Sequence, residues 1–383
     1  MMEAEALASA DLVALVRRVF VPRPDDTAIA ILVDLPDAVR PDHPAWRTRR
    51  EMAADWAALL ESQHDVLALH TRLVFFRNAH TNNGDLPADG AWLHRGGVHP
   101  ASAEVLSDEP IISWEDLFAT HSILIAPTQY SATAPLKVAA RSAAIRAATM
   151  PGFRADMIPA LRLDYGEVNR RVVALAALLD DADGADLVFG TPDGEARVHL
   201  DLRYRTAHAS GGLIPNPGTA GNLPSGEAYI VPYEGERPGE PSRTAGVLPV
   251  EFDGEVVRYL ITGNRAVAVL PGGAHADAER DRLSREPAYG NLAELGLGVL
   301  AAFGIVPVGE VLLDEKLGLH IAFGRSDHFG GQVGPTNFSS PGAVVHIDRV
   351  YVPACQPQIT VARVDLVSAS GDRRALMIDG AYV

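Results

Sequence analysis

The sequence predicts an α/β fold: an N-terminal open α/β sheet domain over residues 1–186, followed by a mainly β (α+β) domain over residues 187–383. Two observations predict this fold. Strand-like apolar runs alternate with helical patterns in the first half, as in open sheets whose strands are joined by crossover helices. After about residue 186, the segments become short, β-rich and separated by Gly and Pro. The 383 residues suffice for two domains of ordinary size.

Apolar spacing predicts the elements of the first domain. Residues 9–20 place apolar side chains at helical intervals, and residues 48–63 are rich in Ala, Leu and Glu without Pro or Gly, so both are predicted helices. The run TAIAILVDL at 27–35 is apolar on both faces, which predicts a central strand of a mainly parallel sheet. The remaining predicted elements are strands over 65–75 and 121–128 and helices over 134–148 and 163–182.

The second domain is predicted to consist mainly of short strands. The segments that predict them are DLVFGTPDGEARVHLDL, GEVVRYLITGNRAVAVL, AVVHIDRVYV and PQITVARVDLV. These segments are rich in β-branched residues and are separated by turn-forming residues. The Gly- and Pro-rich residues 211–226 are predicted to form a loop.

Composition excludes several classes of partner. The chain has 49 acidic and 33 basic residues and a formal net charge of −16, which repels phosphate backbones and anionic membrane surfaces. We therefore expect neither nucleic acid nor a membrane as a partner. No apolar run is long enough to span a bilayer, and the N-terminus lacks the basic region of a signal peptide. Cys355 is the only cysteine, so an intrachain disulfide is excluded and a reducing cytoplasm is expected.

Polar residues interrupt two strand-like runs of the second domain. His346 and Asp348 are two residues apart in AVVHIDRVYV, so their side chains share one face of the predicted strand. His320 lies in the apolar run LGLHIAFG. An isolated His-x-Asp can also be a core histidine that is hydrogen-bonded to its neighbour. The sequence alone leaves both interpretations open.

Two glutamates need a similar explanation. Glu294 is the only charge in YGNLAELGLGVL, and Glu227 follows a Pro-Ser-Gly turn at the start of a predicted strand. A buried carboxylate must be paired, protonated or bound to a cation. Imidazole and carboxylate are ligands for zinc, cobalt or manganese. Five such groups suffice for two divalent metal ions, whereas one ion needs about three.

Four motifs carry a resemblance to a known family. NLPSGE, AELGLG, DEKLGLHIAFGR and HID occur in this order between residues 222 and 348. They resemble the motifs of the thermophilic aminopeptidase T family, which are cytosolic dinuclear metallopeptidases also described as leucyl aminopeptidases. The resemblance implies that Glu227, Glu294, His320, His346 and Asp348 ligate two metal ions. It also implies a homodimer that admits small peptides, and a hydrolase that cleaves N-terminal residues or small amides.

The chain departs from this family near its third motif. The family places a Tyr seven residues after the first His, where this chain has Asp327, followed by His328. The 2,5-dihydroxypyridine dioxygenases are a more distant resemblance and an alternative: they share the His-x-Asp but bind one iron, with a His in place of Glu294. A non-catalytic binding protein with the same fold is the third alternative.

The remaining candidates concern catalysis and substrate binding. Glu227 or Glu294 could act as the general base if one of them does not ligate a metal. Asp327 and His328 are candidates for an acid/base or specificity role, and the alternative is an exposed Gly-rich loop. Arg325 could bind a substrate carboxylate or pair with an acidic residue of the chain.

Overall fold

The computed structural model describes residues 6–108 and 111–383. It shows a mixed α/β fold of two compact units, as the sequence predicts. The first unit contains the chain up to residue 168 together with residues 212–225, and the second contains residues 169–211 and 226–383. The chain therefore passes between the units after residues 168, 211 and 225, whereas the sequence texture predicted a single boundary near residue 187.

The first unit is an open α/β sheet with helices. Its helices are α1 (Ser9–Phe20), α2 (Pro44–Glu61), α3 (His64–Leu67), α4 (Trp114–Thr120), α5 (Thr133–Ala143) and α6 (Ile158–Leu161), and its strands are β1 (Ala28–Leu35), β2 (His70–Arg77), β3 (Ala91–Leu93), β4 (Ile111–Ile112), β5 (Ile123–Ala126), β6 (Arg146–Thr149) and β10 (Thr219–Asn222). The strand order is β10-β6-β5-β1-β2-β3-β4, and the pairs from β10 to β2 are parallel. The predicted central position of β1 is confirmed.

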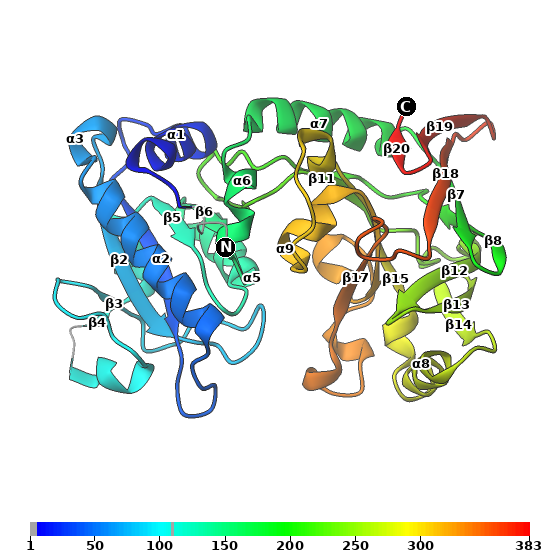
Figure 1. The fold of residues 1–383 in the computed structure, drawn as a ribbon, viewed down its shortest axis with the longest axis horizontal. Coiled ribbons are helices and arrows are strands. Elements are labelled where there is room, and N and C mark those ends of the chain that lie inside the picture. Colours follow the sequence, from blue (N-terminus) through cyan, green and yellow to red (C-terminus); the bar gives the residue numbers. More distant parts are fainter. Residues whose placement is uncertain (1–5, 109–110) are drawn as a thin grey trace. The chain divides into compact units, whose positions relative to one another are not determined.

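Two helices cover this sheet. α2 packs on β1 and β2, whereas α5 packs on β6 and β10 (Figure 1). The chain moves in opposite directions from β1 to β2 and from β5 to β6, so right-handed crossovers put these two helices on opposite faces. This arrangement buries β1 from both sides, which explains its unbroken apolar run.

Three predictions for the first unit are wrong in part. The predicted strand 65–75 begins later, because residues 64–67 form the short helix α3 before β2. The predicted helix 134–148 ends at Ala143, where the next residue adopts a left-handed conformation, and β6 follows. The predicted loop 211–226 contains β10, which pairs in parallel with β6 at the edge of the sheet. The chain therefore returns to the first sheet after it has entered the second unit.

The second unit contains two antiparallel sheets. Its strands are β7 (Gly184–Thr191), β8 (Gly194–Asp201), β9 (His208–Ser210), β11 (Glu227–Ile230), β12 (Ala245–Phe252), β13 (Glu255–Thr262), β14 (Arg265–Val269), β15 (Leu292–Gly298), β16 (Leu319–Gly324), β17 (His346–Val350), β18 (Thr360–Val367), β19 (Arg373–Ile378) and β20 (Ala381–Tyr382). Its helices are α8 (Ala274–Arg285) and α9 (Val311–Asp314), and α7 (Tyr165–Asp180) contains the first crossing between the units. The predicted β-rich second half is confirmed.

One of these sheets carries the conspicuous polar residues. We call it the site sheet; its strand order is β17-β16-β15-β11-β9. The other sheet has eight strands in the order β14-β13-β12-β8-β7-β18-β19-β20, and α8 packs on β13 and β14 (Figure 1). β15 and β16, the middle strands of the site sheet, are buried along their whole length.

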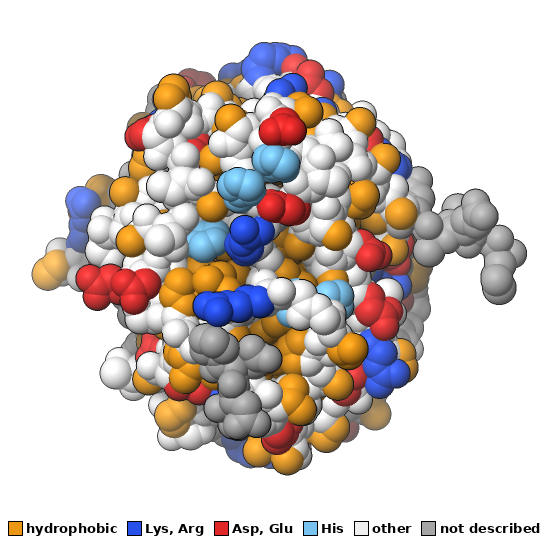
Figure 2. Space-filling view, turned by 90° about the vertical axis from the view of Figure 1, so that its left-hand side faces the viewer, with side chains coloured by type: hydrophobic (Ala, Val, Ile, Leu, Met, Phe, Trp, Pro, Cys, Tyr) orange, Lys and Arg blue, Asp and Glu red, His pale blue; other side chains and the backbone are white. Residues whose placement is uncertain are grey.

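The surface and the hydropathy of the helices bear on possible partners. On the face drawn in Figure 2, acidic, basic and histidine side chains are interspersed with apolar ones. Within residues 6–108 and 111–383, no helix has the length and apolar character needed to cross a membrane. The expected absence of nucleic-acid and membrane partners stays a prediction.

Candidate metal centre

The register of the site sheet brings the five predicted ligands onto one face. Residues paired across an antiparallel sheet point to the same face, as do residues two apart in one strand. Glu294 lies opposite Ala322, which lies opposite Asp348. His320 is two residues before Ala322, and His346 is two residues before Asp348. Glu227 begins the neighbouring strand β11. Four strands therefore present imidazole and carboxylate groups to one region.

Glycine makes room for this arrangement. The Cβ atom of any other residue at position 296 would overlap the ring of His320, which is fully buried. A Cβ atom at position 298 would overlap the backbone of Lys316. The motif AELGLG thus combines a ligand candidate with two positions at which neighbouring atoms leave no space for a side chain.

The ligand atoms form two groups that share Glu294. Glu227, Glu294 and His320 form one group, and Glu294, His346 and Asp348 form the other; within each group all ligand atoms lie within 4.8 Å of one another. Oε1 of Glu294 lies 3.3 Å from Nε2 of His320, and its Oε2 lies 3.2 Å from Nε2 of His346. The two oxygens of one carboxylate therefore face two different imidazoles.

Unsatisfied oxygen atoms complete both groups. Oε2 of Glu227 lies 3.4 Å from Nε2 of His320, and Oδ1 of Asp348 lies 3.5 Å from Nε2 of His346. Both oxygens are buried and have no hydrogen-bond partner. Ligands about 2.0–2.1 Å from a shared tetrahedral ion are about 3.3 Å apart. The spacing, the burial and the donor types therefore fit a metal-binding role for each group.

Contacts behind the candidate ligands orient them. Nδ1 of His346 lies 2.8 Å from the main-chain oxygen of Arg325, so this nitrogen carries a proton and Nε2 faces the carboxylates. Nζ of Lys316 donates to Oε1 of Glu227 at 2.5 Å and also to Glu315. The Lys316 side chain is only 1% exposed. The ammonium therefore occupies one oxygen of Glu227 and leaves the other directed at His320.

The electrostatics show how strongly the groups of the metal-free protein depend on one another. Burial opposes the charge of His320, but the hydrogen bond with Glu294 and the nearby carboxylates raise its pKa to about 9. Burial likewise opposes the charge of Glu294, but His320 and His346 lower its pKa to about 2. Burial raises the pKa of Glu315 to about 8, even though the charge of Lys316 acts in the opposite direction. Closely packed charges of this kind are typical of functional sites.

The three other candidates lie in the loop after β16. Nε of Arg325 donates to Oδ1 of Asp327 at 2.5 Å, so the structure shows Arg325 paired with an acidic residue of the chain. The ring of His328 lies 5.3 Å from the ring of His346. Burial and the charge of His346 lower the pKa of His328 to about 4. Binding of a substrate carboxylate by Arg325 stays a prediction.

Sequence reasoning missed four residues near the site. Lys316 and Glu315 stand in the motif DEKLGLH, where they resemble ordinary surface charges, although Lys316 is one of only two lysines in the chain. Tyr229 follows Glu227 at the spacing that places both side chains on one face, which is a signal that could have been used. Phe329 lies next to His328 in a loop, and nothing in the sequence indicates its position.

Comparison with known proteins gives fold-level matches. No protein-family model and no curated protein matches the chain. The chain is similar to the structure of 2,5-dihydroxypyridine dioxygenase from Pseudomonas putida KT2440, with a TM-score of 0.60 and 16% identity over 98% of each chain. It is also similar to wild-type AmpT from Thermus thermophilus, with a TM-score of 0.55 and 15% identity over 98% of this chain and 99% of that one. At such identities the likeness shows the fold alone.

Proposed function

We propose that the chain is a metal-dependent hydrolase that removes N-terminal residues from small peptides, or cleaves small aminoacyl amides, at a two-metal site. The observation that carries the proposal is Glu294, whose two oxygens face the imidazoles of His320 and His346. A carboxylate in this position can bridge a pair of ions. When bound, two divalent ions would polarise a carbonyl group and lower the pKa of a water molecule between them.

The proposal gives each side chain a separate task. Glu227, Glu294 and His320 would hold one ion, and Glu294, His346 and Asp348 would hold the other. Three protein ligands for each ion are typical of catalytic sites, which keep a position for water or substrate. Because Glu227 and Glu294 are assigned to the ions, proton transfer falls to His328. Its ring lies 5.3 Å from that of His346, so this imidazole lies beside the proposed metal ligands.

The separation of the two imidazoles supports this proposal over the one-iron alternative. A single iron of the dioxygenase type needs two histidines and one carboxylate around one point. In the described part of the chain, no group of mutually close ligand atoms contains both His320 and His346. Oε2 of Glu227 and Oδ1 of Asp348 support a metal-binding role over a non-catalytic one, because a buried oxygen without a hydrogen-bond partner is costly.

Metal analysis combined with two activity assays tests the proposal. The protein is freed of metal, reloaded with zinc, cobalt, manganese or ferrous iron, and analysed for bound metal. We expect about two ions per chain and hydrolysis of aminoacyl p-nitroanilides with zinc, cobalt or manganese. One iron per chain, with oxygen uptake on 2,5-dihydroxypyridine, would establish the dioxygenase alternative instead. Absence of bound metal would leave the non-catalytic alternative.

The substrate class and a homodimeric assembly belong to the same proposal and rest on the family resemblance. Light scattering coupled to size-exclusion chromatography gives the mass of the assembly in solution. A mass of one chain would remove the dimer from the proposal without affecting the metal site, because all five ligand candidates come from one chain.

A further inference from the structure

Aromatic side chains lie directly beside the candidate metal ligands. The ring of Phe329 is 4.8 Å from that of Tyr229 and 5.5 Å from that of His346. The ring of His328 is 3.9 Å from that of Phe329. We call Tyr229, His328 and Phe329 the aromatic wall. Tyr229 and Phe329 are half-buried and the His328 side chain is 33% exposed, so part of the wall is open to solvent.

Tyr229 belongs to the same face of the site sheet as the ligand candidates. It lies opposite Gly296, which in turn lies opposite His320. Because Gly296 has no side chain, no β15 side chain stands between Tyr229 and His320 in this row. The ring of His208 stacks on Tyr229 at 5.0 Å. Among the described residues, none forms a hydrogen bond with the Tyr229 hydroxyl, so this residue contributes its ring rather than a polar contact.

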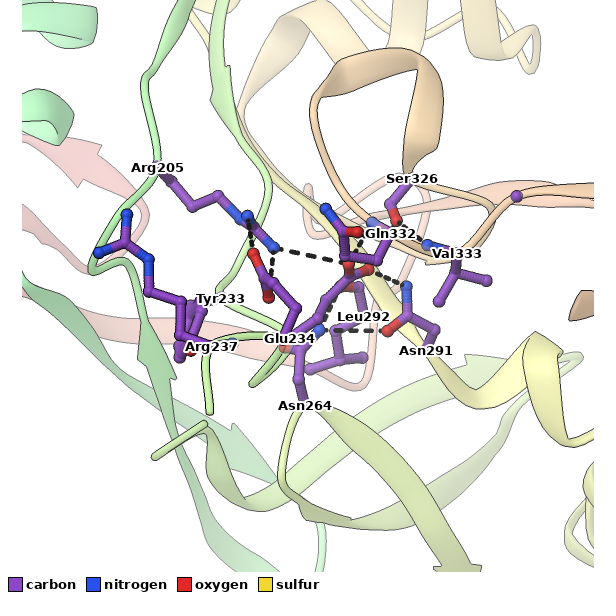
Figure 3. Close-up of polar contacts among 12 residues, drawn as sticks. Arg205, Tyr233, Glu234, Arg237, Asn264, Asn291, Leu292, Ser326, Gln332 and Val333 are labelled. Carbon is purple, nitrogen blue, oxygen red and sulfur yellow. Dashed lines mark hydrogen bonds and ion pairs between the residues drawn. The ribbon is translucent and has the colours of Figure 1, made fainter. Parts of the chain in front are cut away.

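One buried carboxylate holds the loop that carries Phe329. Figure 3 shows Ser326, Gln332 and Asn291 converging on Glu234. Oε1 of Glu234 accepts from Oγ of Ser326 at 2.6 Å and from Nδ2 of Asn291 at 2.7 Å, and its Oε2 accepts from the backbone nitrogen of Gln332. The side chain of Glu234 is 7% exposed. Both ends of segment 326–332 are therefore fixed to one group, and Phe329 lies between them.

The candidate metal ligands and the aromatic wall together define which substrates the site would bind. We propose that the aromatic wall is a specificity surface that takes a planar ring of the substrate beside the metal pair, and that Glu234 is the positioning residue for this surface. Rings gain edge-to-face or offset contacts with Phe and Tyr beyond the burial of their area, whereas aliphatic groups gain burial alone. This inference rests on the metal site of the proposed function and adds its substrate class.

Two hydroxamates test the wall independently of the reaction, because the hydroxamate group binds metal in hydrolases and oxygenases alike. Benzohydroxamate and acetohydroxamate are titrated calorimetrically into the zinc-loaded protein. We expect benzohydroxamate to bind about tenfold more tightly, as a ring contact of about 1.4 kcal/mol gives. Phe329→Ala should remove most of this preference. The conservative variant Phe329→Tyr should restore it, because it keeps a ring at this position.

The outcomes separate this inference from the proposed function. Equal affinities for the two hydroxamates, or a full ring preference in Phe329→Ala, would overturn the specificity surface and leave the metal site intact. Failure of both hydroxamates to bind the zinc-loaded protein would overturn this inference, whereas failure of the protein to retain zinc would overturn the metal site as well.

The role of Glu234 needs a readout that a loss of stability does not change. In Glu234→Gln we expect the ratio of the two affinities to fall toward one, while zinc content and acetohydroxamate affinity stay unchanged. Glu279→Gln is the matched control, since Glu279 is a buried carboxylate that accepts from Tyr259 and Tyr289 and not from segment 326–332. If both variants change the ratio equally, Glu234 has no specific positioning role.

Discussion

The ring of His320 occupies the space in which a side chain at position 296 would lie. The two residues are direct partners across β15 and β16, and a Cβ atom at position 296 would overlap the imidazole. His320 is also fully buried, so its ring cannot move toward solvent. The glycine therefore sets the position of an imidazole that faces Glu227 and Glu294.

Replacement of this glycine should weaken metal binding more than it weakens the fold. In Gly296→Ala the added methyl group displaces the ring of His320, and we expect the zinc affinity to fall at least about tenfold, as when the support behind a ligand is lost. Competition with a chromogenic chelator measures this affinity. Gly342→Ala is the matched control, because no atom lies near the corresponding Cβ position. Unchanged zinc affinity in Gly296→Ala would show that His320 does not ligate.

Glu294 should determine the number of bound ions. In Glu294→His, one imidazole nitrogen replaces two carboxylate oxygens, so the residue can no longer serve both groups. We expect zinc content to fall from about two ions per chain to about one, with loss of aminoacyl amide hydrolysis. Plasma emission spectroscopy gives the metal content, and chromogenic anilides give the rate.

A comparison variant removes a candidate ligand that belongs to one group alone. Asp348→Asn changes only the group of His346, so the group of Glu227 and His320 should still bind its ion. If Glu294→His retains two ions and near-parent hydrolysis, Glu294 does not bridge the two groups and is not part of the site.

Local patterns predicted the candidate ligands, because each departs from the strand that contains it. His346 and Asp348 are polar at a spacing of two, and Glu294 is a lone charge in a run of apolar and Gly residues. Cross-strand register, however, follows from tertiary packing and cannot be counted along the chain. The sharing of Glu294 by two groups and the contact between Tyr229 and Phe329 therefore required the structure.

The errors in the predicted fold have a similar cause. β6 has the sequence Arg-Ala-Ala-Thr, whose alanines favour a helix, yet it pairs with β5 in the sheet. β10 has the sequence Thr-Ala-Gly-Asn, which carries no strand signal, and it forms by pairing with β6 at the sheet edge. In both segments, tertiary pairing outweighs local propensity.

Lys316 should contribute most to the free energy of unfolding when metal is absent. Its ammonium is the cationic partner of Glu227 and Glu315 and is almost fully buried. Lys316→Met leaves these two carboxyl groups without that partner, and we expect the free energy of unfolding of the metal-free protein to fall by about 3–5 kcal/mol. The loss should be smaller in the zinc-loaded protein, because the ion then compensates Glu227. Denaturant unfolding with and without a chelator measures both values.

A second substitution checks whether charge or packing causes this loss. Lys316→Arg keeps the positive charge, so it should retain more stability than Lys316→Met in the metal-free protein. Equal losses in the two variants, unaffected by zinc, would assign the effect to packing and contradict the electrostatic role.

The pair of Asp201 and Arg203 should make the stability of the second unit depend on pH in the acid range. Asp201 is fully buried and accepts from Nε and Nη2 of Arg203 at 2.9 and 2.8 Å. Burial alone would raise its pKa, but the hydrogen bonds with Arg203 and the backbone nitrogen of Arg243 lower the pKa below its usual value of 3.8. A carboxylate with a depressed folded-state pKa stabilises the protein above the unfolded-state value, and this contribution is lost as the pH falls through the folded-state pKa.

Substitution of Asp201 should therefore lower the free energy of unfolding and remove part of its dependence on pH. In Asp201→Asn, the buried Arg203 loses its main charge partner, and we expect the free energy of unfolding at pH 7 to fall by about 3 kcal/mol. Below about pH 4, where the parent protein loses the same contribution, the difference between the two proteins should shrink. Denaturant titrations from pH 7 to pH 3 measure this convergence.

Glu195→Gln is the matched control, because its pair with Arg197 is exposed and contributes little at any pH. A constant difference between Asp201→Asn and the parent protein across this range would mean that Asp201 stabilises the unit by its shape and hydrogen bonds rather than by its charge.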